Sequence, residues 1–149
     1  LGTMGYGLPG AIGAQIGNPG VPVISISGDG GMQMNIQELA TAVLEELPII
    51  NCIFNNTYLG MVRQWQELFY KERYSATIME NPDFVAIAAA YKIAAKHIYE
   101  REELDGAFKE MLSHDGPYLL VAEVEERGMV YPMVPAGTCV TNIIMGDNQ

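Results

Sequence analysis

Short runs of apolar, β-branched residues alternate along this chain with segments in which apolar residues recur every three or four positions. The first pattern is typical of strands buried on both faces of a sheet, and the second is typical of helices that bury one face. Parallel strands need helix-length connections between them, so this alternation favours a parallel sheet. The sequence therefore predicts an α/β fold of three layers, with helices on both faces of a parallel sheet.

The 149 residues suit a single domain, which we expect to span residues 1–128. Pro9 is well placed in the first turn of one helix, and Asn35 is expected to cap another. Residues 129–149 are rich in Pro, Gly and Met, which predicts an extended tail of the same domain. The expected strands are 21–27, 49–54, 96–99 and 118–124, and the expected helices are 9–17, 35–46, 59–70, 82–92 and 102–113.

The charge of the chain excludes two classes of partner. There are 18 acidic and 8 basic side chains, for a net charge of −10, whereas nucleic acids and anionic membranes both attract basic surfaces. Any anionic ligand must then be held by backbone N–H groups, helix ends or a metal ion. No apolar run is long enough to span a membrane. Cys52 and Cys139 lie far apart and indicate no disulfide framework, which favours a reducing, cytoplasmic location.

Polar residues follow two of the expected strands. A glycine-rich turn containing Asp29 and Gly30 follows the first strand, and the pair Asn55 and Asn56 follows the next. Gly30 and Asn55 are separated by 24 residues, the length of one crossover helix plus one strand. Ligands of open parallel sheets bind beyond the carboxyl ends of the strands. Adjacent strands would therefore bring Asp29 and Asn56 together at such a site.

These two side chains are suited to a magnesium ion. Carboxylate and amide oxygens are hard ligands, and Mg²⁺ takes few of them from the protein and the rest from phosphates and water. Glycines let backbone N–H groups approach the phosphates, and the N-terminal end of the following helix favours negative charge. The alternative is a capped turn at Asp29 and a turn-forming pair at Asn55 and Asn56, with no metal ion.

The order Gly28-Asp29-Gly30, then 24 residues, then Asn55-Asn56 resembles the signature of thiamine-diphosphate enzymes. This resemblance implies that Asp29 and Asn56 supply side-chain ligands to Mg²⁺ and that the Tyr58 carbonyl supplies a backbone ligand. It also implies backbone contacts to the diphosphate, which would come from Gly28, Gly30 and Gly31.

Three further segments are similar to the acetohydroxyacid (acetolactate) synthase family. They are LGTMGYGLPGAIGAQ at residues 1–15, NNTYLGMVRQWQELFYKERY at residues 55–74 and PMVPAG at residues 132–137. The resemblance covers nearly the whole chain. The residues that it places around the cofactor are Gly2 and Met4 beside the aminopyrimidine ring, with Leu59, Gly60 and Met61 along the cofactor.

The same resemblance implies that Trp65, with Met61, shapes the pocket for the second 2-keto acid. Met61 and Trp65 are four residues apart on an expected helix, so the alternative is that both are simple core contacts. Arg63 and Gln64 share this helix, and nothing in the sequence assigns chemistry to them.

The family resemblance implies a transferase that decarboxylates pyruvate and condenses the two-carbon unit with pyruvate or 2-ketobutyrate in branched-chain amino acid biosynthesis. It implies thiamine diphosphate, Mg²⁺ and FAD as cofactors, and a homodimer or tetramer of the full-length subunit, with a small regulatory subunit left open. The chain begins with Leu1, which we interpret as the start of a piece of a longer protein. The FAD domain and the glutamate that activates the cofactor would lie outside this piece, so the isolated chain is expected to be inactive.

Three alternatives remain at this point. Related thiamine-diphosphate enzymes, such as glyoxylate carboligase, sulfoacetaldehyde acetyltransferase and pyruvate oxidase, would share the fold. A non-catalytic domain would keep the fold without the cofactor. Residues 5–10 also fit G-x-G-x-x-G, with Asp29 at 19 residues beyond Gly10, which is a weak match to nicotinamide-cofactor folds because no strand precedes Gly5.

Overall fold

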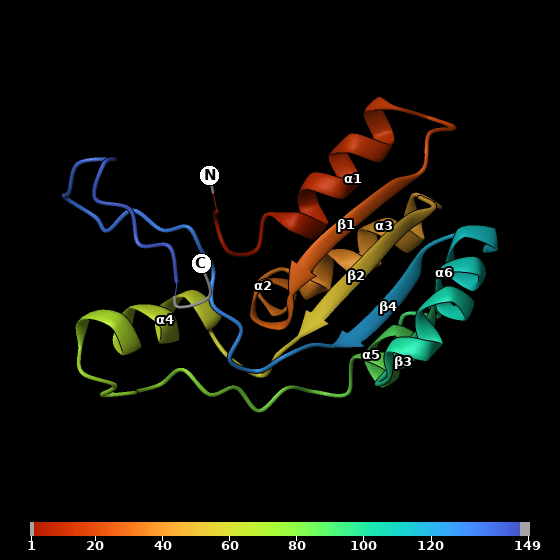
Figure 1. Cartoon of the computed structure of the whole chain (residues 1–149). Helices are drawn as coiled ribbons and strands as arrows, with labels where there is room; N and C mark the ends of the chain where they lie inside the picture. The colour runs from red at the N-terminus through yellow and green to blue at the C-terminus, as the bar shows by residue number, and fades with distance from the viewer. Residues whose placement is uncertain (1, 147–149) are drawn as a thin grey trace.

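A computed structural model describes residues 2–146 of the chain. Its centre is a four-stranded sheet in the order β1-β2-β4-β3 (Figure 1). β1 (Val23–Gly28) pairs with β2 (Ile49–Asn55), and β4 (Tyr118–Glu123) lies between β2 and β3 (Ala94–Ile98). All three pairings are parallel, so the predicted parallel sheet is confirmed.

Helices cover both faces of this sheet, as predicted (Figure 1). One face packs against α1 (Gly7–Gly17), α3 (Leu39–Leu44) and α5 (Phe84–Ala90), and the other packs against α6 (Leu104–Ser113). Ile53 of β2 lies at the centre of the first core and is fully buried. Burial of a side chain of this size stabilises the fold by roughly 1.5–3 kcal/mol. The three-layer α/β prediction is confirmed.

The second face of the sheet is only partly covered. α6 packs over β4, β3 and part of β2. No helix of residues 2–146 covers β1 on this side, so the side chains of β1 that point to this face are exposed to solvent. Ile24, Ile26 and Phe54 are 45%, 66% and 46% exposed there. The expectation that every strand is buried on both faces is therefore wrong for β1. An apolar strand face of this kind needs a further element to cover it, and none lies within residues 2–146.

The segment expected to be one helix over residues 35–46 is two shorter elements. A 3₁₀ turn (Ile36–Glu38) leads into α3, and the Asn35 side chain makes no capping hydrogen bond. Its amide instead donates to the Gly5 carbonyl at 2.8 Å, which joins the start of the chain to this segment. The predicted Asn35 cap is wrong, because the side chain is turned to donate to the distant Gly5 carbonyl and its oxygen accepts no N–H of the helix.

The other elements lie within a few residues of their expected ranges. α1 begins two residues before Pro9, and a 3₁₀ turn (Arg101–Glu103) precedes α6. The turn expected after β1 is a five-residue helix, α2 (Asp29–Gln33). None of the described helices is long and apolar enough to cross a membrane.

α4 (Gly60–Phe69) lies beyond the carboxyl ends of the strands, and the tail from residue 129 runs beside it (Figure 1). The described part of the tail, residues 129–146, contains no helix or multi-residue strand, as predicted, and Met133 pairs with Ile144 in one antiparallel bridge. Residues 147–149 of the expected tail, and Leu1, lie outside the described residues. The boundary at residue 128 stays a prediction.

Candidate functional site

The carboxyl ends of β1 and β2 lie side by side, and the chain turns away from each end into the loops that carry Asp29 and Asn56. Gly28 is opposite Phe54 in the sheet, so both loops begin at the same edge. The Asp29 carboxylate bridges them, because its Oδ2 accepts the Thr57 backbone N–H at 2.8 Å. The predicted juxtaposition of Asp29 and Asn56 is therefore present in the fold.

Asp29 is 1% exposed and is held by three donors. Its Oδ1 accepts the Gly30 N–H at 2.9 Å, and its Oδ2 also accepts the Asn81 side-chain amide at 2.6 Å. A buried carboxylate is costly unless such hydrogen bonds compensate it, so its position is well determined. The Gly30 N–H is thereby engaged within the chain, and a diphosphate would have to share it. α2 has only five residues, so its dipole is a smaller attraction than the sequence suggested.

All residues predicted to touch the cofactor line one cleft of about 1110 Å³ at this edge. The cleft runs between the start of the chain, the ends of β1 and β2, and the start of α4. Their individual roles stay predictions. The predicted residues in the lining are Gly2, Met4, Gly28, Asp29, Gly30, Gly31, Asn56, Tyr58, Leu59, Gly60 and Met61.

Close packing explains the glycine at position 30. A Cβ atom there would lie 2.8 Å from the Met4 methyl carbon and 3.0 Å from a methyl carbon of Leu59. Both neighbours line the cleft, so a larger residue would displace its walls. Glycine at this position therefore leaves room for a ligand to approach the backbone of residue 30.

The donor set fits a magnesium ion that shares its coordination with a ligand. Within residues 2–146, no group of three or more His, Cys, Asp or Glu side chains is arranged to hold a metal by itself. The Asn56 side-chain oxygen accepts only the Tyr58 N–H, at 3.1 Å, and retains a second acceptor direction. One carboxylate, one amide and a backbone carbonyl leave several positions for phosphate oxygens and water, as Mg²⁺ prefers.

The charges of the residues that line the cleft also favour a bound metal ion. Its described lining contains the carboxylates of Asp29 and Glu125 and no Lys, Arg or His. A diphosphate in this cleft would meet negative side chains unless a cation lay between them. The lining agrees with the expectation that an anionic ligand is held here without basic side chains, by backbone N–H groups, helix ends or a metal ion.

Trp65 lies in an adjoining recess rather than in the cleft itself. This recess, of about 730 Å³, is formed by the exposed face of α4 and shares Met61 with the cleft. Trp65 is 39% exposed and Met61 is 49% exposed, so neither belongs to the core formed by residues 2–146, and their role at the substrate pocket stays a prediction. Phe69 meets the Trp65 ring edge-on, with ring centroids 6.0 Å apart.

Arg63 and Gln64, to which the sequence assigned no chemistry, are 2% and 1% exposed. Gln64 donates to the Val130 carbonyl at 2.9 Å and accepts the Val130 N–H at 2.8 Å. Arg63 pairs with Glu67 of the same helix at 2.6 Å, and it also donates to the Gly128 carbonyl at 3.4 Å and to the Met129 sulfur at 3.7 Å. Two buried polar side chains therefore hold the tail against α4, and Val130 forms part of the cleft wall.

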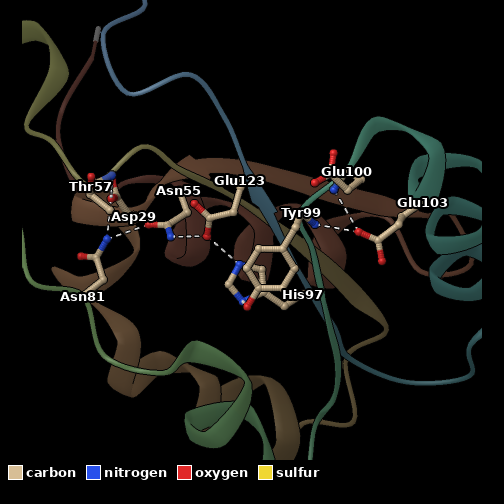
Figure 2. A network of polar contacts seen from close by, with 9 residues as sticks. All are labelled: Asp29, Asn55, Thr57, Asn81, His97, Tyr99, Glu100, Glu103 and Glu123. Carbon is tan, nitrogen blue, oxygen red and sulfur yellow. Dashed lines mark hydrogen bonds and ion pairs between the residues drawn. The ribbon is translucent and has the colours of Figure 1, made fainter.

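A network of polar side chains, which the sequence did not indicate, connects Asp29 with residues outside the cleft lining (Figure 2). Asn81 donates to both Asp29 and Asn55, and Asn55 donates to Glu123 at 2.6 Å. His97 contacts the same Glu123 oxygen at 2.6 Å. The only signal in the sequence was the Asn-Asn pair itself, because the other members are isolated polar residues far apart in the chain.

The chain belongs to the family described as "Thiamine pyrophosphate enzyme, C-terminal TPP binding domain", whose model matches residues 1–122. The predicted thiamine-diphosphate signature is thereby confirmed at the level of the family, and the nicotinamide-cofactor alternative is wrong.

Three similar proteins are all acetolactate synthases by name. The chain is 49% identical over 138 residues to the isozyme 2 large subunit of Escherichia coli K12, covering 92% of this chain and 25% of that protein. It is 46% identical over 149 residues to the mitochondrial catalytic subunit of Saccharomyces cerevisiae, covering 100% and 22%. It is 46% identical over 145 residues to a probable large subunit of Methanocaldococcus jannaschii, covering 97% and 24%. The chain thus spans about a quarter of the length of these relatives.

Proposed function

We propose that this chain is the diphosphate- and metal-binding part of an acetolactate synthase catalytic subunit. The observation that carries the proposal is the meeting of Asp29 and Asn56 in a cleft without basic side chains. Such a cleft accepts a diphosphate only together with a divalent cation. The names of the similar proteins support acetolactate synthesis as the activity of the full-length subunit.

In this proposal Asp29, Asn56 and the Tyr58 carbonyl hold Mg²⁺, and the backbone of residues 28–31 faces the diphosphate. When bound, thiamine diphosphate supplies the stabilisation of negative charge that decarboxylation of a 2-keto acid requires. Met4 and Leu59 contribute apolar surface above Gly30, which excludes water from the bound cofactor. The chain's own task is to place the cofactor and to neutralise its phosphates.

The recess beside the cleft suits the second substrate. Trp65 presents an exposed, oriented ring next to Met61, so a small 2-keto acid such as pyruvate or 2-ketobutyrate would contact both side chains. The activity is the decarboxylation of pyruvate and transfer of the two-carbon unit to this second acid. The full-length subunit would act in the cytoplasm as a homodimer or tetramer and would bind FAD on another domain. The activating glutamate would come from an N-terminal domain, contributed by a partner subunit across a dimer interface.

Calorimetric titration with thiamine diphosphate tests the cofactor site. We expect heat of binding in the presence of Mg²⁺ that disappears with a chelator and in an Asp29→Asn variant. Asp115→Asn is the matched control, because Asp115 is exposed in the loop before β4, at the opposite edge of the sheet. It should bind as the unmodified protein does.

If the 149-residue chain does not bind, the same titration on the full-length subunit decides. Binding there that requires Asp29 supports the proposal, and no binding there would indicate a non-catalytic domain of the same fold. Product analysis on the full-length subunit separates acetolactate formation from the products of related thiamine-diphosphate enzymes.

A further inference from the structure

The Asp29 carboxylate has one free acceptor direction, and its position identifies the oxygen that a metal would use. A carboxylate offers about four lone-pair directions, two on each oxygen. Oδ2 accepts two hydrogen bonds, from the Thr57 N–H and from Asn81 Nδ2, whereas Oδ1 accepts one, from the Gly30 N–H. Oδ2 is therefore saturated, and Oδ1 retains a single direction for a ligand.

Asn81 saturates Oδ2 without lining the cleft. It is half-buried and lies in the loop before α5, and it is not one of the residues that line the cleft. Its Nδ2 donates to Asp29 at 2.6 Å and to Asn55 at 2.7 Å, and its Oδ1 accepts Gln33 Nε2 at 2.8 Å. Both amide hydrogens and the amide oxygen thus have partners, and Asn81 can touch a bound metal only through Asp29.

The orientation of the Asn81 amide, which Asp29 and Gln33 already favour, is reinforced from the next strand. Asn55 and Glu123 are opposite each other on β2 and β4. A glutamate carboxylate accepts hydrogen bonds and does not donate them, so Asn55 must turn its NH₂ group toward Glu123, at 2.6 Å. The Asn55 oxygen then faces Asn81, so Asn81 must donate a hydrogen bond from its own NH₂ group. A reversed Asn81 amide would place its oxygen against the oxygens of Asn55 and Asp29.

We propose that Asn81 is a positioning residue, which holds Asp29 so that only Oδ1 is available to the metal ion. Through this contact, the hydrogen-bonded series Glu123–Asn55–Asn81 favours a cation that is coordinated by only one oxygen of the carboxylate. Mg²⁺ requires a near-ideal octahedron with few protein ligands, whereas the larger Ca²⁺ readily accepts both oxygens of a carboxylate. The network therefore favours Mg²⁺ over Ca²⁺. This inference rests on the proposed function, because it takes Asp29 as a metal ligand.

The test measures metal affinity rather than activity. Mg²⁺ and Ca²⁺ are each titrated calorimetrically into the full-length subunit at a fixed, saturating concentration of thiamine diphosphate. Asn81→Leu preserves the approximate size of the side chain and removes the donor to Asp29 Oδ2. Asn18→Leu is the matched control, because the Asn18 amide donates only to the Ala14 carbonyl, at 2.9 Å, at the end of α1.

We expect Asn81→Leu to weaken Mg²⁺ binding about tenfold, the lower range for loss of a group that orients a metal ligand. Ca²⁺ binding should weaken by less, about threefold, because the freed Oδ2 gives this ion a second oxygen. Asn18→Leu should change neither affinity. A purely structural role for Asn81 would lower both affinities by the same factor, and that result would overturn the proposal.

Glu123→Gln is a second variant, which decides the matter if Asn81→Leu does not fold. The glutamine can present either its oxygen or its NH₂ group to Asn55, so the Asn55 amide is no longer held with its oxygen toward Asn81, and Asn81 loses a fixed acceptor. We expect the preference for Mg²⁺ over Ca²⁺ to fall here too. An unchanged preference in this variant contradicts the proposed chain of contacts, while binding by the unmodified subunit leaves the proposed function intact. Absence of Mg²⁺-dependent cofactor binding in the unmodified subunit would instead overturn both.

Discussion

Replacing Gln64 with methionine should release the tail from α4 without unfolding the sheet. Methionine has nearly the same length and volume, so it fills the buried position but offers neither a strong donor nor a strong acceptor. Two hydrogen bonds to the Val130 backbone, at 2.9 and 2.8 Å, are lost. Each contributes about 0.5–1.5 kcal/mol net, so the local opening of the tail should become about 1–3 kcal/mol easier.

Hydrogen exchange followed by mass spectrometry measures this opening directly. A change of about 1–3 kcal/mol corresponds to exchange roughly 5- to 150-fold faster in the peptide that contains Val130. Peptides from β2 and β4 should keep their protection, because the tail contributes nothing to the two buried cores. Gln37→Met is the matched control, since Gln37 is exposed and should tolerate the change. Unchanged exchange at Val130, or equal acceleration in the strands, would refute the assignment of Gln64 as the residue that holds the tail.

Two further predictions concern the cleft and the cysteines. Gly30→Ala places a methyl group 2.8 Å from the end of Met4, which is a flexible side chain; we expect a stability loss of only about 1 kcal/mol in thermal unfolding, with thiamine-diphosphate affinity clearly reduced in calorimetry. A hydrogen bond from the Thr141 side chain lowers the pKa of the exposed Cys139 thiol, whereas burial raises the pKa of Cys52. As the pH rises, iodoacetamide should therefore label Cys139 first, because the thiolate is the reactive form, and mass spectrometry that finds Cys52 labelled first would contradict this.

The sequence was sufficient to predict what depends on local periodicity. Strands and helices alternate as expected, and the meeting of Asp29 with Asn56 follows from the pairing of consecutive parallel strands. The order of the strands was not predictable in the same way, because β4 inserts between β2 and β3 through contacts that no local pattern records. The meeting of the loops after β1 and β2 was therefore predicted, but the position of β4 beside β2 was not.

Buried polar side chains were the least predictable part of the site. Gln64 lies on a helix whose sequence is polar enough to face water, and only the tail, 66 residues later, buries it. Asn81 is 52 residues from Asp29 and lies in a loop. Isolated amides of this kind have no periodicity, since their role depends on one partner brought near by the fold. They are found only when the donors and acceptors of a buried carboxylate are counted in three dimensions.

The uncovered face of β1 and the cleft are parts of one surface. Ile26 and Phe54 are exposed on that face, and both also line the cleft. The polar half of the cleft, around Asp29 and Asn56, is complete in itself, because every oxygen of the Asp29 carboxylate has a defined set of donors. The apolar residues Ile26 and Phe54 of the cleft lining remain 66% and 46% exposed. Under the proposed function, the polar half would hold the phosphate end of the cofactor, and the exposed Ile26 and Phe54 would lie on the side of its reactive end.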